Sequence, residues 1–145
     1  MKITSRFTVA VHTLLVIYRF CGQTKTTSEF IAASVNVNPV VIRRTLLSLK
    51  AAGIVDVKAG SGGASIIKDL NDITLYGVFR AVDSVDGDLF HFHENPNPTC
   101  PVGKNIHYVL DGHLSDAQKA MEDSLKSVTL AELAAQLEGN TAIKE

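Results

Sequence analysis

The sequence predicts a mainly α-helical fold with one small β-hairpin and a long helix near its C-terminus. Apolar residues recur at the three- and four-residue intervals of one helical face in several segments. Residues 54–67 instead alternate apolar and polar side chains on either side of a glycine-rich turn, which is typical of two half-buried strands. The 145 residues, 46 % of them hydrophobic, suffice for one domain with an appended arm.

Two helices are predicted near the start of the chain. The first is capped by Ser5 or the threonine before it and ends at Gly22. Its apolar face includes Cys21, which we expect in the core. The second helix is short and is capped by Thr26 or Thr27.

The third helix has the clearest local start signal in the chain. Asn38 is a favoured N-cap residue, and Pro39 suits the first helical position because the amide hydrogen that proline lacks would have no partner there. Gly53 ends the helix, as a left-handed C-terminal residue does. Arg43 and Arg44 fall on its solvent-facing side, opposite an apolar face formed by Ile42, Leu46 and Leu49.

A β-hairpin and further helices follow. Residues 54–58 and 64–67 form its strands, and a fourth helix spans residues 75–82. After a loop, Pro101 opens a helix of about 26 residues, or about 39 Å, which a domain of this size cannot cover with its own chain. Its apolar stripe therefore predicts a homodimer interface, formed by Val102, Ile106, Val109, Leu110, Leu114, Met121 and Leu125.

These elements predict a winged helix-turn-helix DNA-binding domain at residues 1–82 and a sensor-type loop at residues 83–100. Residues 101–138 form the dimerisation helix and a short closing helix, and residues 139–145 a flexible tail. No apolar run approaches the roughly 18 residues of a membrane span, and two distant cysteines give no disulfide framework. We expect a cytoplasmic protein with reduced thiols and no membrane partner.

Charge is divided unevenly along the chain. Residues 1–68 hold nine Lys/Arg and two acidic residues, a net charge of +7, whereas residues 69–145 hold five and thirteen, a net charge of −8. The total of −1 therefore conceals a basic module joined to an acidic one. Basic side chains gain affinity for DNA by releasing counterions from its phosphates, so the first module is the one expected to bind.

The predicted helices and hairpin can dock on double-stranded DNA. A helix in the major groove needs polar side chains near its N-terminus and cations beside phosphates. Asn38 and Val40 are expected at base edges, and Arg43 and Arg44 at phosphates or guanine edges. The expected phosphate contacts are Ser5, Arg6, Thr26, Thr27 and Ser28, and the wing consists of Lys58, Gly60, Gly62 and Gly63. Taken singly, the two arginines are also consistent with a solvated helix face, and the glycines with an ordinary hairpin turn. The order of these features along the chain, together with the uneven charge, favours a DNA-binding surface.

The order of elements resembles the BadM/Rrf-type bacterial regulators, which include repressors of iron–sulfur cluster assembly and of cysteine metabolism and a nitric-oxide-sensitive repressor. The matching residues are Met1-Lys2-Ile3-Thr4, Asn38-Pro39 through Leu46-Leu47-Ser48-Leu49, Ala52-Gly53-Ile54-Val55, Gly60-Ser61-Gly62-Gly63-Ala64, Asp72-Ile73-Thr74-Leu75 and Ala81-Val82-Asp83. The resemblance covers the chain to about residue 130 and implies a dimeric winged-helix repressor whose long helix crosses between subunits. Ala59 and Ser65 depart from the family, which often has Arg and Tyr there.

Cys100 is the candidate sensor, with His93 and His107 nearby in the sequence. Family members that bind a cluster place three cysteines about six residues apart before the long helix, whereas Glu94 and Ile106 occupy the flanking positions here. We therefore expect no iron–sulfur cluster. Cys100 remains either a packing residue beside surface histidines, a redox- or electrophile-sensing thiol at a helix N-terminus, or part of a zinc site. The spacing matches no compact zinc motif, so no cofactor is expected.

The sequence lacks the patterns of an enzyme, such as a nucleophile elbow, a phosphate-binding glycine motif or a carboxylate pair. We expect a homodimeric transcriptional regulator, a repressor, that binds a palindromic operator and responds through Cys100 or a small ligand. The alternative is a winged-helix adaptor that binds protein and not DNA. Arg43 and Arg44 discriminate between the two, because adaptors usually lack a basic recognition face.

Overall fold

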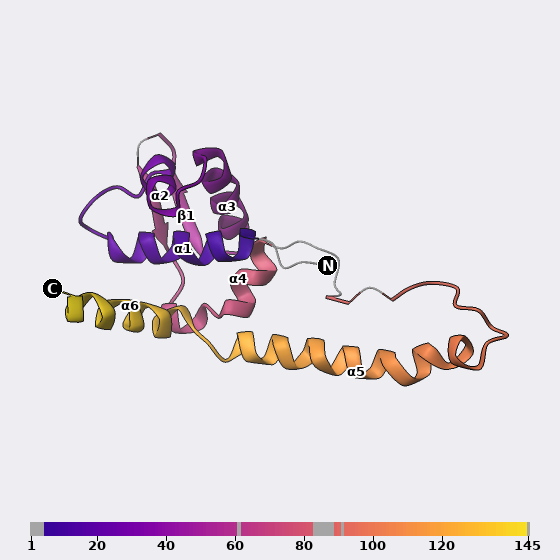
Figure 1. Cartoon of the computed structure of the whole chain (residues 1–145). Helices are drawn as coiled ribbons and strands as arrows, with labels where there is room; N and C mark the ends of the chain where they lie inside the picture. Colours follow the sequence, from indigo (N-terminus) through magenta and orange to yellow (C-terminus); the bar gives the residue numbers. More distant parts are fainter. Residues whose placement is uncertain (1–4, 61, 83–88, 91, 145) are drawn as a thin grey trace.

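The computed structural model describes residues 5–60, 62–82, 89, 90 and 92–144, without the side chains of residues 141–144. In these residues the chain is mainly helical with one two-stranded hairpin, so the predicted fold class is confirmed (Figure 1). The elements are α1 (Ser5–Arg19), α2 (Ser28–Val35), α3 (Pro39–Ala51), β1 (Val55–Lys58), β2 (Gly63–Ile66), a 3-10 turn (Leu70–Asp72), α4 (Leu75–Val82), α5 (Pro101–Lys126) and α6 (Leu130–Lys144).

Side-chain and backbone caps set the ends of α2 and α3. The Thr27 hydroxyl accepts a hydrogen bond from the Phe30 amide at 3.2 Å, and Asn36 ends α2 in the left-handed conformation, at φ 63°. Asn38 Oδ1 accepts from the Val40 amide at 2.9 Å, with Pro39 as the first residue of α3. Gly53, at φ +76°, follows α3, so both predicted ends of this helix are confirmed.

The core lies where α1, α2, α3, α4 and the hairpin meet. Its largest buried side chains include Leu14 of α1, Ile31 of α2, Ile42 and Leu49 of α3, and Val78 of α4. The prediction that Cys21 is a core residue is wrong, because its side chain is exposed. The reason is local: α1 ends at Arg19, so Cys21 lies in the turn beyond the helix and leaves its apolar face.

The hairpin is fastened to the start of α2. β1 and β2 pair antiparallel, with Val55 opposite Ile66 and Lys58 opposite Gly63. The Ala64 amide donates to the Thr26 carbonyl at 3.0 Å, and the Thr26 hydroxyl donates to the Ala64 carbonyl at 2.7 Å. This two-way link holds the hairpin as a wing beside the helix-turn-helix.

Helix α5 projects away from the rest of the protein, and only its C-terminal part meets α4 (Figure 1). No α5 residue is buried, which follows from this projection. No helix in the described part of the chain has the length and apolar character that crossing a bilayer requires.

Helix α6 returns alongside α1. The Leu130 amide donates to the Ile73 carbonyl at 2.7 Å, and the Tyr18 hydroxyl of α1 donates to Glu138. Residues 139–144, which were predicted to form a flexible tail, continue α6 to its end at Lys144. Gly139 lowers helix propensity by only about 1 kcal/mol, and no proline follows to stop the helix.

Candidate nucleic-acid interface

Helix α3 presents an exposed face between two hollows. Arg43 lines one hollow and Arg44 lines the other. The first has a volume of about 520 Å³ and lies between the start of α2, α3 and the wing. Its lining includes Arg43, Thr27, Ser28, Lys58 and Gly60. The second, of about 360 Å³, is lined by Arg6, Val41, Arg44, Thr45, Ser48 and Val82.

The structure thus brings most of the sequence-predicted contact residues onto one surface. Asn38 and Val40 are exposed at the start of α3. Ser5 begins α1 and is exposed next to Arg6. Cationic side chains therefore lie on both sides of the exposed face of α3.

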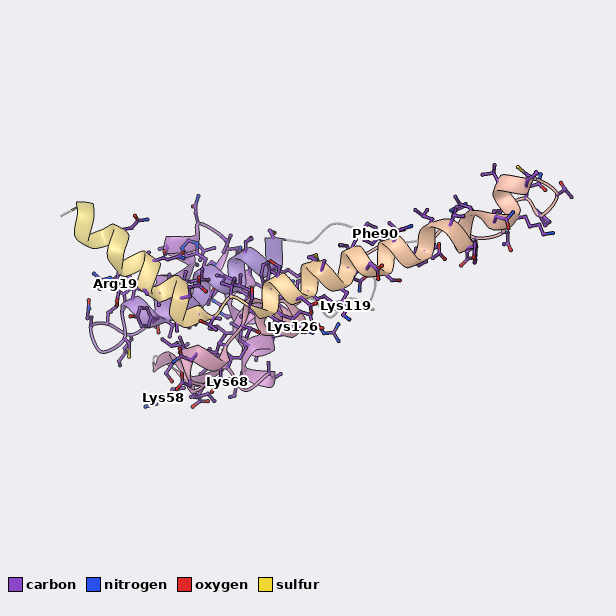
Figure 2. The ribbon with its side chains drawn as sticks, turned by 90° about the horizontal axis from the view of Figure 1, so that it is seen from below. Arg19, Lys58, Lys68, Phe90, Lys119 and Lys126 are labelled. Atoms are coloured by element: carbon purple, nitrogen blue, oxygen red, sulfur yellow. The ribbon has the colours of Figure 1, made fainter. Side chains whose placement is uncertain are left out.

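Gly60, Gly62 and Gly63 of the wing lie where a side chain would be strained or would clash. Gly60 and Gly63 have φ of +75° and +78°, a backbone conformation that side chains disfavour. A Cβ atom on Gly63 would also lie 3.0 Å from the Thr26 nitrogen, and one on Gly62 only 2.4 Å from the Lys58 Cβ. Figure 2 shows Lys58 and Lys68 on the same side of the protein, far from Lys119 on α5.

Thr26, one of the predicted phosphate contacts, lines the first hollow. Its side chain is only 4 % exposed, and its hydroxyl is directed at the Ala64 carbonyl of the wing. The Thr27 hydroxyl also has an internal partner, the Phe30 amide. The Thr26 hydroxyl therefore fastens the wing, and a phosphate contact at the start of α2 stays a prediction for Ser28 and the backbone amides.

Sequence reasoning missed Glu29 as part of this surface. Arg43 Nη2 donates to Glu29 Oε1 at 3.1 Å, and both side chains are more than half exposed. Interaction with the α2 backbone and then with Arg43 lowers the pKa of Glu29, so the carboxyl stays ionised. The only signal in the sequence was that Glu29 and Asp56 are the two acids of residues 1–68.

The candidate sensor residues lie at the far end of α5. Cys100 occupies the N-cap position of α5, and backbone N–H groups of Gly103 and Val102 lower the pKa of its thiol. The ring centroids of His93 and His107 lie 5.4 Å apart, and His107 Nδ1 is 3.0 Å from Asp111 Oδ2.

An iron–sulfur cluster requires three or four thiolates with few substitutes. Cys21 and Cys100 are the two cysteines of the chain, and Cys21 lies at the other end of the fold, in the turn after α1. Within the described residues, no three His, Cys, Asp or Glu side chains gather as metal ligands. The two cysteines of one chain therefore do not supply the thiolates that a cluster needs.

The predicted dimer residues form a stripe along α5 that its own chain leaves largely uncovered. Val102, Val109 and Leu110 are 69 %, 56 % and 37 % exposed. The remaining members of the stripe are partly buried: Ile106, Leu114, Met121 and Leu125. The most exposed positions lie toward the projecting end of the helix.

Comparisons with known proteins agree with this architecture. Residues 3–136 match the family model of Rrf2, described as "Iron-dependent Transcriptional regulator". The chain is 49 % identical over 131 residues to the "Putative HTH-type transcriptional regulator YwnA" of Bacillus subtilis (strain 168), covering 90 % of this chain and 96 % of that protein.

Two solved structures show the same fold. One, described as a "putative DNA binding protein", is 44 % identical with a TM-score of 0.69 and covers 89 % of this chain and 98 % of that one. CymR, described as the global cysteine regulator of B. subtilis, is 20 % identical with a TM-score of 0.67, over 93 % of this chain and 97 % of its own.

Proposed function

The chain belongs to the Rrf2 family of transcriptional regulators, and from that premise we propose that it is a homodimeric repressor of a palindromic DNA operator. It is a regulator and not an enzyme. We assign DNA binding to residues 1–82, sensing to the loop at residues 83–100, and dimerisation to residues 101–138. Such a repressor acts beside the chromosome, in the cytoplasm.

The observation that carries the proposal is the placement of Arg43 and Arg44 on opposite sides of the exposed face of α3. Arg43 faces the hollow toward the wing, and Arg44 faces the hollow toward Arg6. A helix inserted in the major groove has one phosphate strand on each side, so each hollow suits one strand. Asn38 and Val40, at the exposed start of α3, then face the base edges.

Dimerisation supplies the two-fold symmetry that a palindrome matches. The apolar stripe of α5 is exposed toward the projecting end of the helix and partly buried elsewhere, and a second copy of the same stripe would cover it. Two copies joined along α5 present two α3 helices, which suits half-sites one helical turn of DNA apart, or about 34–36 Å.

A salt titration tests the role of the arginines. The probe is the DNA immediately upstream of the gene that encodes this chain, with Arg43→Gln and Arg44→Gln as variants. Lys119→Gln is the matched control, because it removes one positive charge from α5, far from Lys58 and Lys68 (Figure 2). Each arginine variant should weaken binding. An arginine that contacts a phosphate should, when replaced, also flatten the slope of log K against log salt by about 2 per dimer, since each lost phosphate contact contributes about 0.9.

Equal salt slopes for both arginine variants, the control and the unaltered protein would remove the case for DNA binding through α3. Binding of a protein partner with no measurable affinity for DNA would instead support the adaptor alternative. The salt titrations give the first result, and a pull-down of protein partners together with the DNA titration gives the second.

The oligomeric state is tested by sedimentation velocity. Leu110→Glu places a charge in the α5 stripe, whereas Ser115→Glu places one on the opposite side of the same helix. We expect Leu110→Glu to sediment as a monomer and Ser115→Glu to remain a dimer. Monomeric unaltered protein at micromolar concentration would contradict the proposed dimer.

We further propose that regulation acts through Cys100 or through a small ligand at the start of α5, without a resident iron–sulfur cluster or zinc. The support is the lowered pKa of the Cys100 thiol and the lack of a metal-ligand group among the described residues. Protein purified without oxygen should carry neither iron nor the visible absorption of a cluster. Peroxide should release the unaltered protein from DNA, whereas Cys100→Ser should keep its DNA affinity. Identical release of both proteins would exclude the thiol as the sensor and leave regulation by a small ligand.

A further inference from the structure

Glu29 is an acidic side chain on a surface otherwise suited to phosphates. It lies in the first turn of α2 and lines the same hollow as Ser28, Arg43 and Lys58. A carboxylate in that place repels phosphates, so it weakens binding to any duplex that offers no compensating base contact. An exposed ion pair of this kind adds little to folding stability, so its effect is to be sought in binding.

The geometry of the pair suggests what Glu29 does. Only Arg43 Nη2 is bonded to Glu29 Oε1, at 3.1 Å, whereas a guanidinium carries five N–H donors. The donors that remain are enough for the two hydrogen bonds by which arginine reads the O6 and N7 atoms of guanine. A guanidinium held at one nitrogen also loses less rotational freedom when it meets a base than a free one does.

We propose that Glu29 is a specificity-determining residue of the DNA interface, which positions Arg43 to read one base of the operator. At that base, Arg43 keeps its bond to Glu29 and makes its contacts to guanine. On other DNA, Arg43 either leaves Glu29 unpaired beside a phosphate or stays with Glu29 and contributes nothing to the complex. This inference rests on the proposed DNA-binding function.

The experiment is a parallel selection from a pool of DNA duplexes with a randomised central segment, which requires no knowledge of the operator. The variants are Glu29→Gln, which removes the charge, and Glu29→Asp, which keeps the charge but shortens its reach to Arg43. The matched control is Asp56→Asn, because Asp56 is the other acid of residues 1–68 and is also paired with a cation, Lys50, at 3.9 Å.

The unaltered protein and Asp56→Asn should select the same two-fold motif. Both Glu29 variants should lose the preference at one position of each half-site, the position that Arg43→Gln also loses. Affinity for the selected duplex relative to a scrambled one should fall about 10-fold in both, as expected for one base-specific pair. Glu29→Gln alone should also bind the scrambled duplex more tightly, with a salt slope steeper by about 1 per subunit.

A double-mutant cycle shows whether Glu29 acts through Arg43. In an Arg43→Gln background, Glu29→Gln should not change the base preference further, whereas in an Arg44→Gln background it should still abolish it. The same motif and the same affinity ratio in folded Glu29→Gln and Glu29→Asp would overturn the inference and leave the regulator proposal intact. If the unaltered protein enriches no motif, both proposals fail.

Discussion

Replacing Gly63 by alanine tests whether the wing is fastened to α2 as the structure indicates. Gly63 has φ +78°, and an alanine Cβ would lie 3.0 Å from the Thr26 nitrogen and 3.2 Å from its carbonyl carbon and oxygen. These are backbone atoms, which cannot rotate out of the way. Gly60 has nearly the same φ, +75°, but a Cβ at that position would meet nothing within 4 Å. Gly60→Ala is therefore the matched control for backbone strain alone.

The two substitutions should differ by the energy of the wing attachment. Left-handed backbone costs an alanine about 1 kcal/mol relative to glycine, and this is the whole effect expected of Gly60→Ala. Gly63→Ala carries the same strain and also displaces Ala64 from Thr26, where two hydrogen bonds of 3.0 and 2.7 Å each contribute about 1 kcal/mol. We therefore expect Gly63→Ala to lower the free energy of unfolding by about 3 kcal/mol in total.

Urea denaturation, monitored by circular dichroism, measures the free energy of unfolding of both variants. The slope of that free energy against urea concentration should be the same in both variants and in the unaltered protein. Equal losses of stability for Gly60→Ala and Gly63→Ala would show that the contact with Thr26 carries no energy. The wing would then be held by its own strand pairing, and the idea that Thr26 fastens it would be refuted.

Three further predictions concern a cap, the core and the thiol. Asn38→Ala should lower the free energy of unfolding by about 1 kcal/mol in urea titrations, because the Val40 amide loses its partner; unchanged stability would contradict this cap. Leu130→Ala, at a side chain only 1 % exposed, should cost about 2–5 kcal/mol, and a loss under about 1 kcal/mol would show that α6 is not part of the core. In a Cys21→Ser background, alkylation of Cys100 should reach half its maximal rate at lower pH in the native protein than in urea, because the amides of Gly103 and Val102 stabilise the thiolate and lower its pKa. Coincident pH profiles would refute that.

Local signals in the sequence were enough to predict α3 and α5. Asn38 and Pro39 before α3, Gly53 after it and Pro101 at the start of α5 act within a few residues, so the ends of these helices can be read without knowing the fold. The same holds for the hairpin, whose glycine-rich turn separates two alternating segments.

Features that depend on contacts between distant segments could not be predicted in this way. The Glu29–Arg43 pair exists only because α2 and α3 meet, and Thr26 is buried only because the wing folds against it. The end of α6 is a similar case. Gly139 reads as a helix end, yet the bond from Tyr18 to Glu138 holds the preceding turn against α1.

The link between Thr26 and Ala64 also bears on how such a protein can change over generations. The hairpin is bonded to the segment before α2 at Ala64, one residue pair from its turn, whereas a side chain added at Gly60 within the turn would meet nothing within 4 Å. Substitutions at Gly60 would therefore alter the surface of the turn without shifting α3. In the proposed complex with DNA, the turn could acquire new contacts while the position of α3 is inherited unchanged.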